Sequence, residues 1–149
     1  SQNVFEGLEL LARSNGVEPE FLEIGKQTWE EATSETITLL KKLVEDEKFH
    51  PSQITLLVPH GSDIKEIKNA KYSNTKSIEG LGVNISSVFQ FKGLENDIVV
   101  LLIPNFQSLE ATYTRNPLNL VYVGISRAKY LLYVVGSGEI KKLINWDKS

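Results

Sequence analysis

The chain has 149 residues, of which 41% are hydrophobic and 23% charged, and its formal net charge is −3. This length and composition fit one globular domain with a substantial core. No apolar run approaches the ~18 residues of a membrane span, and the lack of cysteine excludes disulfides and cysteine-based metal sites. The net charge indicates no overall basic surface for nucleic acid. We expect a cytoplasmic protein without a membrane partner.

Hydrophobic periodicity predicts alternating helices and strands. In chain order, the expected elements are a helix at 5–11, a strand at 21–24, a helix from a Thr28–Glu31 capping box to 44, a strand at 54–58, a helix at 64–70, strands at 83–89 and 98–103, a helix from Asn116-Pro117, a strand at 130–135 and a helix at 139–146.

The strands are apolar on both faces, and this pattern predicts an α/β fold whose mostly parallel central sheet is covered on both sides. Ligands of such sheets bind in loops at the carboxyl ends of strands. The turn Lys92-Gly93-Leu94-Glu95 follows a predicted strand. It is therefore a candidate site at the carboxyl edge of the sheet.

Nothing in the sequence predicts a self-sufficient active site. A P-loop requires Gly-x-x-x-x-Gly-Lys-Ser/Thr, because its backbone N–H groups wrap the phosphates. The nearest approach is Gly25-Lys26, where Glu20 and Gln27 replace a glycine and the magnesium-binding hydroxyl. The two histidines each adjoin a proline and are expected in loops. The sequence also has no methionine, even at position 1, so we expect residues 1–149 to be one domain of a longer protein.

The segment that precedes the last predicted strand carries a single arginine. Its β-branched residues at 121–125 favour a strand locally, whereas apolar residues at 118, 121, 122, 125 and 128 fall on one face of a helix. On a helix, Arg127 would lie roughly 200° from Ile125. Its guanidinium would then point away from the core and toward something outside this domain.

Two stretches resemble motifs V and VI of UvrD/Rep-type superfamily 1 DNA helicases. Residues 86–104 (SSVFQFKGLENDIVVLLIP) are similar to motif V, and residues 120–136 (LVYVGISRAKYLLYVVG) to motif VI. The motifs occur in the family's order, and each is followed by a predicted strand. The resemblance implies a RecA-like (P-loop NTPase-type) three-layer domain, the second motor domain of such a helicase. ATP with Mg²⁺ would bind in the cleft between this domain and an N-terminal RecA-like motor domain, which would carry the P-loop and the magnesium ligands.

The resemblance also implies roles for individual residues. Arg127 matches the arginine that acts on the γ-phosphate, and Glu95 the glutamate that contacts the ribose hydroxyls. Gly93 would allow the tight turn beside the nucleotide, and Lys92 would give phosphate-side or structural support. The remaining matches face single-stranded DNA: Ser87, Phe89 and Gln90.

Two departures and two alternatives accompany this resemblance. Phe89 stands where the family has histidine, and the sequence leaves open whether it faces DNA or the core. The family's large insertion before motif V is absent, because only residues 59–83 fill that gap. The alternatives are a superfamily 1 RNA-directed helicase domain and a degenerate RecA-like binding or scaffold module. This chain is expected to contribute no metal ligand.

Overall fold

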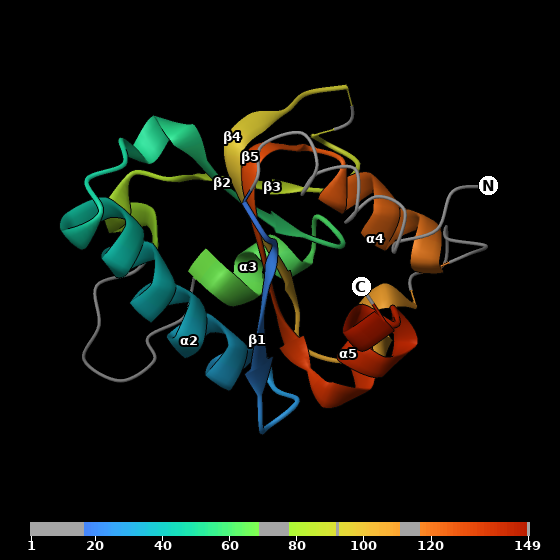
Figure 1. Cartoon of the computed structure of the whole chain (residues 1–149). Coiled ribbons are helices and arrows are strands. Elements are labelled where there is room, and N and C mark those ends of the chain that lie inside the picture. The colour runs from blue at the N-terminus through green and yellow to red at the C-terminus, as the bar shows by residue number, and fades with distance from the viewer. Residues whose placement is uncertain (1–16, 69–77, 92, 111–116, 149) are drawn as a thin grey trace.

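The computed structural model describes residues 17–68, 78–91, 93–110 and 117–148 (Figure 1). The helix expected at 5–11, the residues Lys92 and Asn116, and the last two residues of the helix expected at 64–70 lie outside this part of the chain. No helix among the described residues is long and apolar enough to cross a membrane.

The described strands form one parallel sheet of five in the order β1-β5-β4-β2-β3. Their bounds are Glu20–Ile24 for β1, Ile54–Val58 for β2, Asn84–Ser87 for β3, Asn96–Ile103 for β4 and Ala128–Ser137 for β5. The predicted parallel α/β architecture is confirmed. The long strands β4 and β5 occupy interior positions, whereas β1 and β3 form the two edges.

Helices cover both faces of the sheet (Figure 1). Helices α2 (Trp29–Lys41) and α3 (Asp63–Lys68) lie on one face, and α4 (Pro117–Ile125) and α5 (Gly138–Leu143) on the other. Residues Lys42–Asp46 continue α2 as a π-helical turn, and short 3₁₀ helices occupy Pro51–Gln53, Ile78–Leu81, Phe106–Leu109 and Trp146–Lys148. The ambiguous segment before β5 is therefore helical.

Alternate side chains of the central strands enter two separate cores, as the pleat of a strand requires. On β4, Val99 and Leu101 pack toward α4, while Val100 and Leu102 pack toward α2. All four side chains are fully buried. Burial on both faces explains why these strands appear as continuous apolar runs in the sequence.

The capping box predicted for α2 forms only in part. The Thr28 hydroxyl accepts a hydrogen bond from the Glu31 backbone N–H at 3.2 Å. The Glu31 carboxylate instead accepts from the backbone N–H groups of Gly25 at 3.1 Å and Lys26 at 2.6 Å. It therefore fixes the loop after β1 rather than the N-cap itself.

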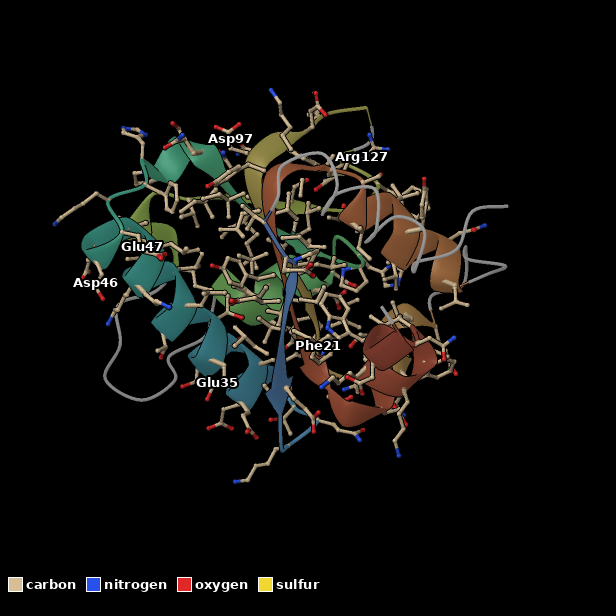
Figure 2. All side chains as sticks on the ribbon, in the orientation of Figure 1. Phe21, Glu35, Asp46, Glu47, Asp97 and Arg127 are labelled. Carbon is tan, nitrogen blue, oxygen red and sulfur yellow. The ribbon has the colours of Figure 1, made fainter. Side chains whose placement is uncertain are left out.

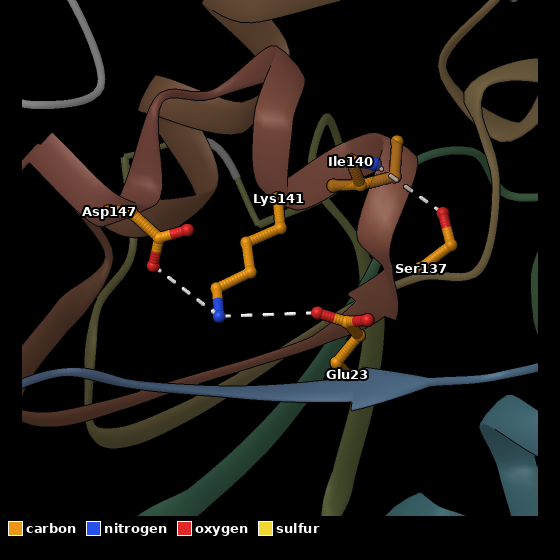
Figure 3. Close-up of polar contacts among 5 residues, drawn as sticks. All are labelled: Glu23, Ser137, Ile140, Lys141 and Asp147. Carbon is orange, nitrogen blue, oxygen red and sulfur yellow. Dashed lines mark hydrogen bonds and ion pairs between the residues drawn. The ribbon is translucent and has the colours of Figure 1, made fainter.

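Polar contacts fasten α5 to the edge of the sheet (Figure 3). The Ser137 hydroxyl caps the helix by accepting from the Ile140 N–H at 3.4 Å. Lys141 Nζ lies 4.0 Å from Glu23 Oε1 on β1 and 3.4 Å from Asp147 Oδ1. These ion pairs contribute little stability, because the carboxylates of Glu23 and Asp147 are exposed to solvent.

The loop between β3 and β4 runs from the carboxyl ends of the strands, the carboxyl edge of the sheet, to their amino ends, the amino edge. It leaves the carboxyl end of β3 after Ser87 and returns to the amino end of β4 at Asn96, with β2 between the two strands. Val88 and Phe91 anchor it in the core on the α4 side. The expectation that Gly93–Glu95 lies at the carboxyl edge is therefore wrong. These residues follow a strand in sequence, but they precede the amino end of the next one.

Candidate functional site

The two motif-bearing loops meet at the amino edge of the sheet. Strands β4 and β5 are neighbours, and Asn96 is paired with Ala128. The turn at Gly93–Glu95 directly precedes β4, and Arg127 directly precedes β5. Arg127 and Asp97, the second residue of β4, lie at the same edge in Figure 2. Parallel pairing thus brings together segments more than 30 residues apart in the sequence.

Gly93 has the backbone conformation that favours glycine. Its φ is +81°, in the left-handed region where a Cβ atom is strained. The turn before it is stabilised by hydrogen bonds from Phe91 N–H to the Ser87 carbonyl and from Leu94 N–H to the Phe91 carbonyl, each 3.0 Å long. Gly93 thus has the backbone conformation of a tight turn, and its place beside a nucleotide stays a prediction.

Arg127 follows the last turn of α4, and its guanidinium lies against the neighbouring turn. Its backbone N–H donates to the Gly124 carbonyl at 3.2 Å, and its Nη1 donates to the Leu94 carbonyl at 3.4 Å. Its Nε is buried and has no hydrogen-bond partner within the described part of the chain. The side chain is half-buried rather than fully directed outward, because the Leu94 carbonyl holds one of its terminal nitrogens.

Glu95 and Leu94 are exposed at this edge, where the Leu94 side chain has 55% of its surface accessible. The site therefore combines an acceptor at Glu95 with a donor at Arg127 on adjacent segments. Lys92, the third residue expected to face the nucleotide, lies outside the described residues.

The loop between β3 and β4, residues 88–95, is called the crossing loop below. The residues expected to face DNA lie at its other end, next to β3. Phe89 is 56% exposed, and Gln90 is also exposed, so Phe89 does not belong to the core. Ser87 is only 2% exposed, and its hydroxyl accepts from the Gln90 N–H at 3.2 Å. These residues therefore follow the carboxyl end of β3, whereas Arg127 precedes the amino end of β5.

Sequence inspection missed Asn96, whose amide joins three segments at the amino edge. Its Nδ2 donates to the Ser52 carbonyl at 3.0 Å and to Thr55 Oγ1 at 2.9 Å. These partners lie 44 and 41 residues away in the sequence. The only local signal is a polar amide at the first position of an apolar strand.

The loop after β2 contains the second histidine. His60 donates its backbone N–H to Asp63 Oδ2 at 3.0 Å, and its Nε2 is buried without a partner among the described residues. Burial raises the pKa of Asp63, although the hydrogen bond from His60 opposes the shift. Within the described ranges, no three acidic or histidine side chains are grouped so as to hold a metal ion.

Comparison with protein families matches residues 82–135 to the UvrD-like helicase C-terminal domain. This range contains the crossing loop, the turn at Gly93 and Arg127. The predicted resemblance to a UvrD-type C-terminal domain is confirmed.

Among solved structures, this chain is similar to the C-terminal domain of a possible DNA helicase from Lactobacillus plantarum WCFS1. The TM-score is 0.63 at 16% sequence identity, and the match covers 93% of this chain and 89% of the other. This similarity shows that the two chains share the same α/β fold. None of the curated proteins compared with the chain matches it.

Proposed function

We propose that this domain is the second motor domain of an ATP-dependent DNA helicase or translocase. It would supply an arginine finger and a ribose-contacting glutamate to an ATP site shared with a P-loop domain. The observation that carries the proposal is the contact between Arg127 Nη1 and the Leu94 carbonyl, because it brings the finger beside the turn that bears Glu95.

The chemistry of phosphoryl transfer suits this pair of residues. Negative charge spreads over the γ-phosphate oxygens in the transition state, and a planar guanidinium stabilises that charge. The buried Arg127 Nε–H donates no hydrogen bond to a described residue, so it is available as a donor in the assembled site. The Glu95 carboxylate would accept from the ribose hydroxyls. Mg²⁺, bound by the P-loop domain, would neutralise charge on the phosphates.

Single-stranded DNA would pass over the other end of the crossing loop. Phe89 offers an exposed aromatic face on which a base can stack. The Ser87 hydroxyl is buried and already accepts a hydrogen bond, so its contribution would be to hold the loop. Closure of the two motor domains on ATP would move this surface along the single-stranded DNA.

The first test replaces Arg127 with alanine in the full-length protein. Removal of an arginine finger lowers turnover about 10³–10⁵-fold, and we expect DNA-stimulated ATP hydrolysis to fall in that range while nucleotide binding is largely kept. The matched control is Lys142→Ala, which removes an exposed cation from α5 at the opposite end of the fold. Unchanged turnover in Arg127→Ala would show that Arg127 is not an arginine finger.

A second arm separates this proposal from its competitors. The 149-residue chain alone should hydrolyse no ATP, and turnover by the purified chain would contradict a shared site. Stimulation of the full-length protein by single-stranded RNA rather than DNA would favour the RNA-directed branch. Intact ATP binding with no turnover in the wild-type protein would favour a scaffold module.

A further inference from the structure

We propose that Asn96 is a positioning residue, which holds Arg127 and the Gly93–Glu95 turn in one fixed arrangement. The geometric part of this inference stands on contacts within the domain. Its catalytic consequence rests on the proposed function of Arg127.

The backbone of Asn96 is bonded directly to Arg127. The Asn96 N–H donates to the Arg127 carbonyl at 3.0 Å. Asn96 also follows Glu95 in the chain and lies two residues after Leu94, whose carbonyl accepts from the Arg127 guanidinium. One short segment therefore contacts both the backbone and the side chain of the arginine.

The side chain of Asn96 fixes this segment from the opposite direction. Its Nδ2 donates to the Ser52 carbonyl and to the buried hydroxyl of Thr55 on β2, and its Oδ1 accepts from the Asp97 N–H at 2.9 Å. An amide is needed for this set of bonds, because it supplies two donor hydrogens and an acceptor. Neither aspartate, when ionised, nor alanine could replace both donated bonds.

The anchor on the β2 side is itself well ordered by hydrogen bonds. His50 and Gln53 form a reciprocal capping box around the 3₁₀ helix that contains Ser52. Gln53 Nε2 also donates to Asp97 Oδ2 at 3.1 Å, which adds a second link to the start of β4. The amide of Asn96 therefore connects the segment beside Arg127 to a 3₁₀ helix whose capping hydrogen bonds do not involve Asn96.

Regular strand pairing would not hold this position without the side chain. The register between β4 and β5 shifts between Asn96 and Ile98. Irregularities of this kind weaken the ladder locally and can redirect a side chain next to a site. A misplacement of about 1 Å in a catalytic group can cost about 10²-fold in rate. We therefore expect the amide to matter for turnover more than for folding.

Asn84 provides a matched control. Its Nδ2 donates to the same Ser52 carbonyl at 3.3 Å, but from the edge strand β3 and without contact to Arg127. Asn84→Ala and Asn96→Ala each remove an amide that donates to the same oxygen. Asn96→Asp is nearly isosteric and retains the acceptor for the Asp97 N–H, but it places a carboxylate oxygen where the amide donated to the Ser52 carbonyl.

The experiment measures the position of Arg127 and the rate of hydrolysis separately. In the 149-residue chain, NMR would follow the Arg127 Nε–H, whose burial slows exchange with water. In the full-length protein, kcat and KM for ATP would be measured with saturating single-stranded DNA. We expect Asn96→Asp and Asn96→Ala to shift the Nε–H resonance, speed its exchange and lower kcat up to about 10²-fold, while KM changes less than kcat. Asn84→Ala should leave both readouts near wild type.

Each other result overturns a defined part of the inference. An unchanged Arg127 resonance in both Asn96 variants would overturn the positioning role. An equal loss of kcat in Asn84→Ala would assign the effect to the edge of the sheet as a whole. If Arg127→Ala itself leaves turnover unchanged, the proposed function fails, whereas the NMR result still decides whether Asn96 positions the arginine. Thr55→Val provides a further variant, since it removes one acceptor and leaves Asn96 in place.

Discussion

Phe89 and Phe91 lie two positions apart in the crossing loop and face opposite environments. Phe91 is 9% exposed and packs in the core on the α4 side, whereas Phe89 is 56% exposed. The loop therefore uses one ring for folding and leaves the other on its surface. The exposed aromatic face of Phe89 suits base stacking.

The two phenylalanines make a paired prediction. Phe91→Ala should lower the free energy of unfolding by about 3 kcal/mol, because a buried aromatic ring is lost. Phe89→Ala should change it by less than about 0.5 kcal/mol, yet weaken single-stranded DNA binding by about 1–3 kcal/mol. Urea unfolding and fluorescence anisotropy with a labelled oligonucleotide would measure the two quantities. If Phe89→Ala leaves the DNA affinity unchanged, this ring does not contribute to DNA binding.

At the scale of elements, the end of β5 approaches β4 too closely for any side chain at Gly136. A Cβ atom there would lie 2.6 Å from the Ile103 carbonyl oxygen, the strand residue with which Gly136 is paired. The nearest obstacle is backbone, which cannot rotate away as a side chain can. The glycine thus allows β5 to pair closely with β4 just before α5 begins.

We expect Gly136→Ala to lower the free energy of unfolding by about 2 kcal/mol. Gly80→Ala is the control, because a Cβ atom at Gly80 would meet nothing within 4 Å. That substitution should be neutral or slightly stabilising, by up to about 1 kcal/mol, since it reduces the entropy of the unfolded chain. Denaturant unfolding of the two variants gives the comparison, and equal stabilities would show that β4 and β5 can separate at no cost.

The sequence predicted the elements better than their ends or their meeting points. Strand β2 was predicted with its observed bounds because its apolar run stops at proline, whereas β3 ends two residues before its prediction because the chain turns at Val88. The predicted location of Gly93–Glu95 at the carboxyl edge was wrong, since sequence order does not reveal that the loop returns to the amino edge of the sheet. Asn96 was missed because its partners lie across the sheet. The roles of Glu95, Arg127, Ser87, Phe89 and Gln90 stay predictions.

At the scale of the whole molecule, the core on the α2 side encloses a tyrosine. Tyr133 on β5 is 6% exposed, and its burial, with smaller effects from Glu20 and Glu47, raises the pKa of its phenol to about 12 from 10.0. The folded state therefore holds this proton more tightly than the unfolded state. The resulting stability is complete below about pH 10 and is lost as the pH rises toward 12.

Substitution of this tyrosine should change the alkaline response of the entire fold. Tyr133→Phe removes the titrating group, so the variant should lose less stability than the wild type between about pH 10 and pH 12. Urea unfolding at several pH values would measure this difference. From about pH 7 to pH 9 both proteins should respond alike, and parallel losses above pH 10 would exclude Tyr133 as the cause.

The crossing loop has a consequence for chain length. Surface loops usually accept insertions, but residues 88–95 carry an exposed aromatic ring near one end and Glu95 at the other, with Val88 and Phe91 fixed in the core between α4 and the sheet. An added or deleted residue would displace one end of the loop relative to the other. The side chains of Val88 and Phe91 would then no longer both fit their positions in the core. Substitutions should therefore be tolerated at several positions of this loop, while its number of residues stays constant.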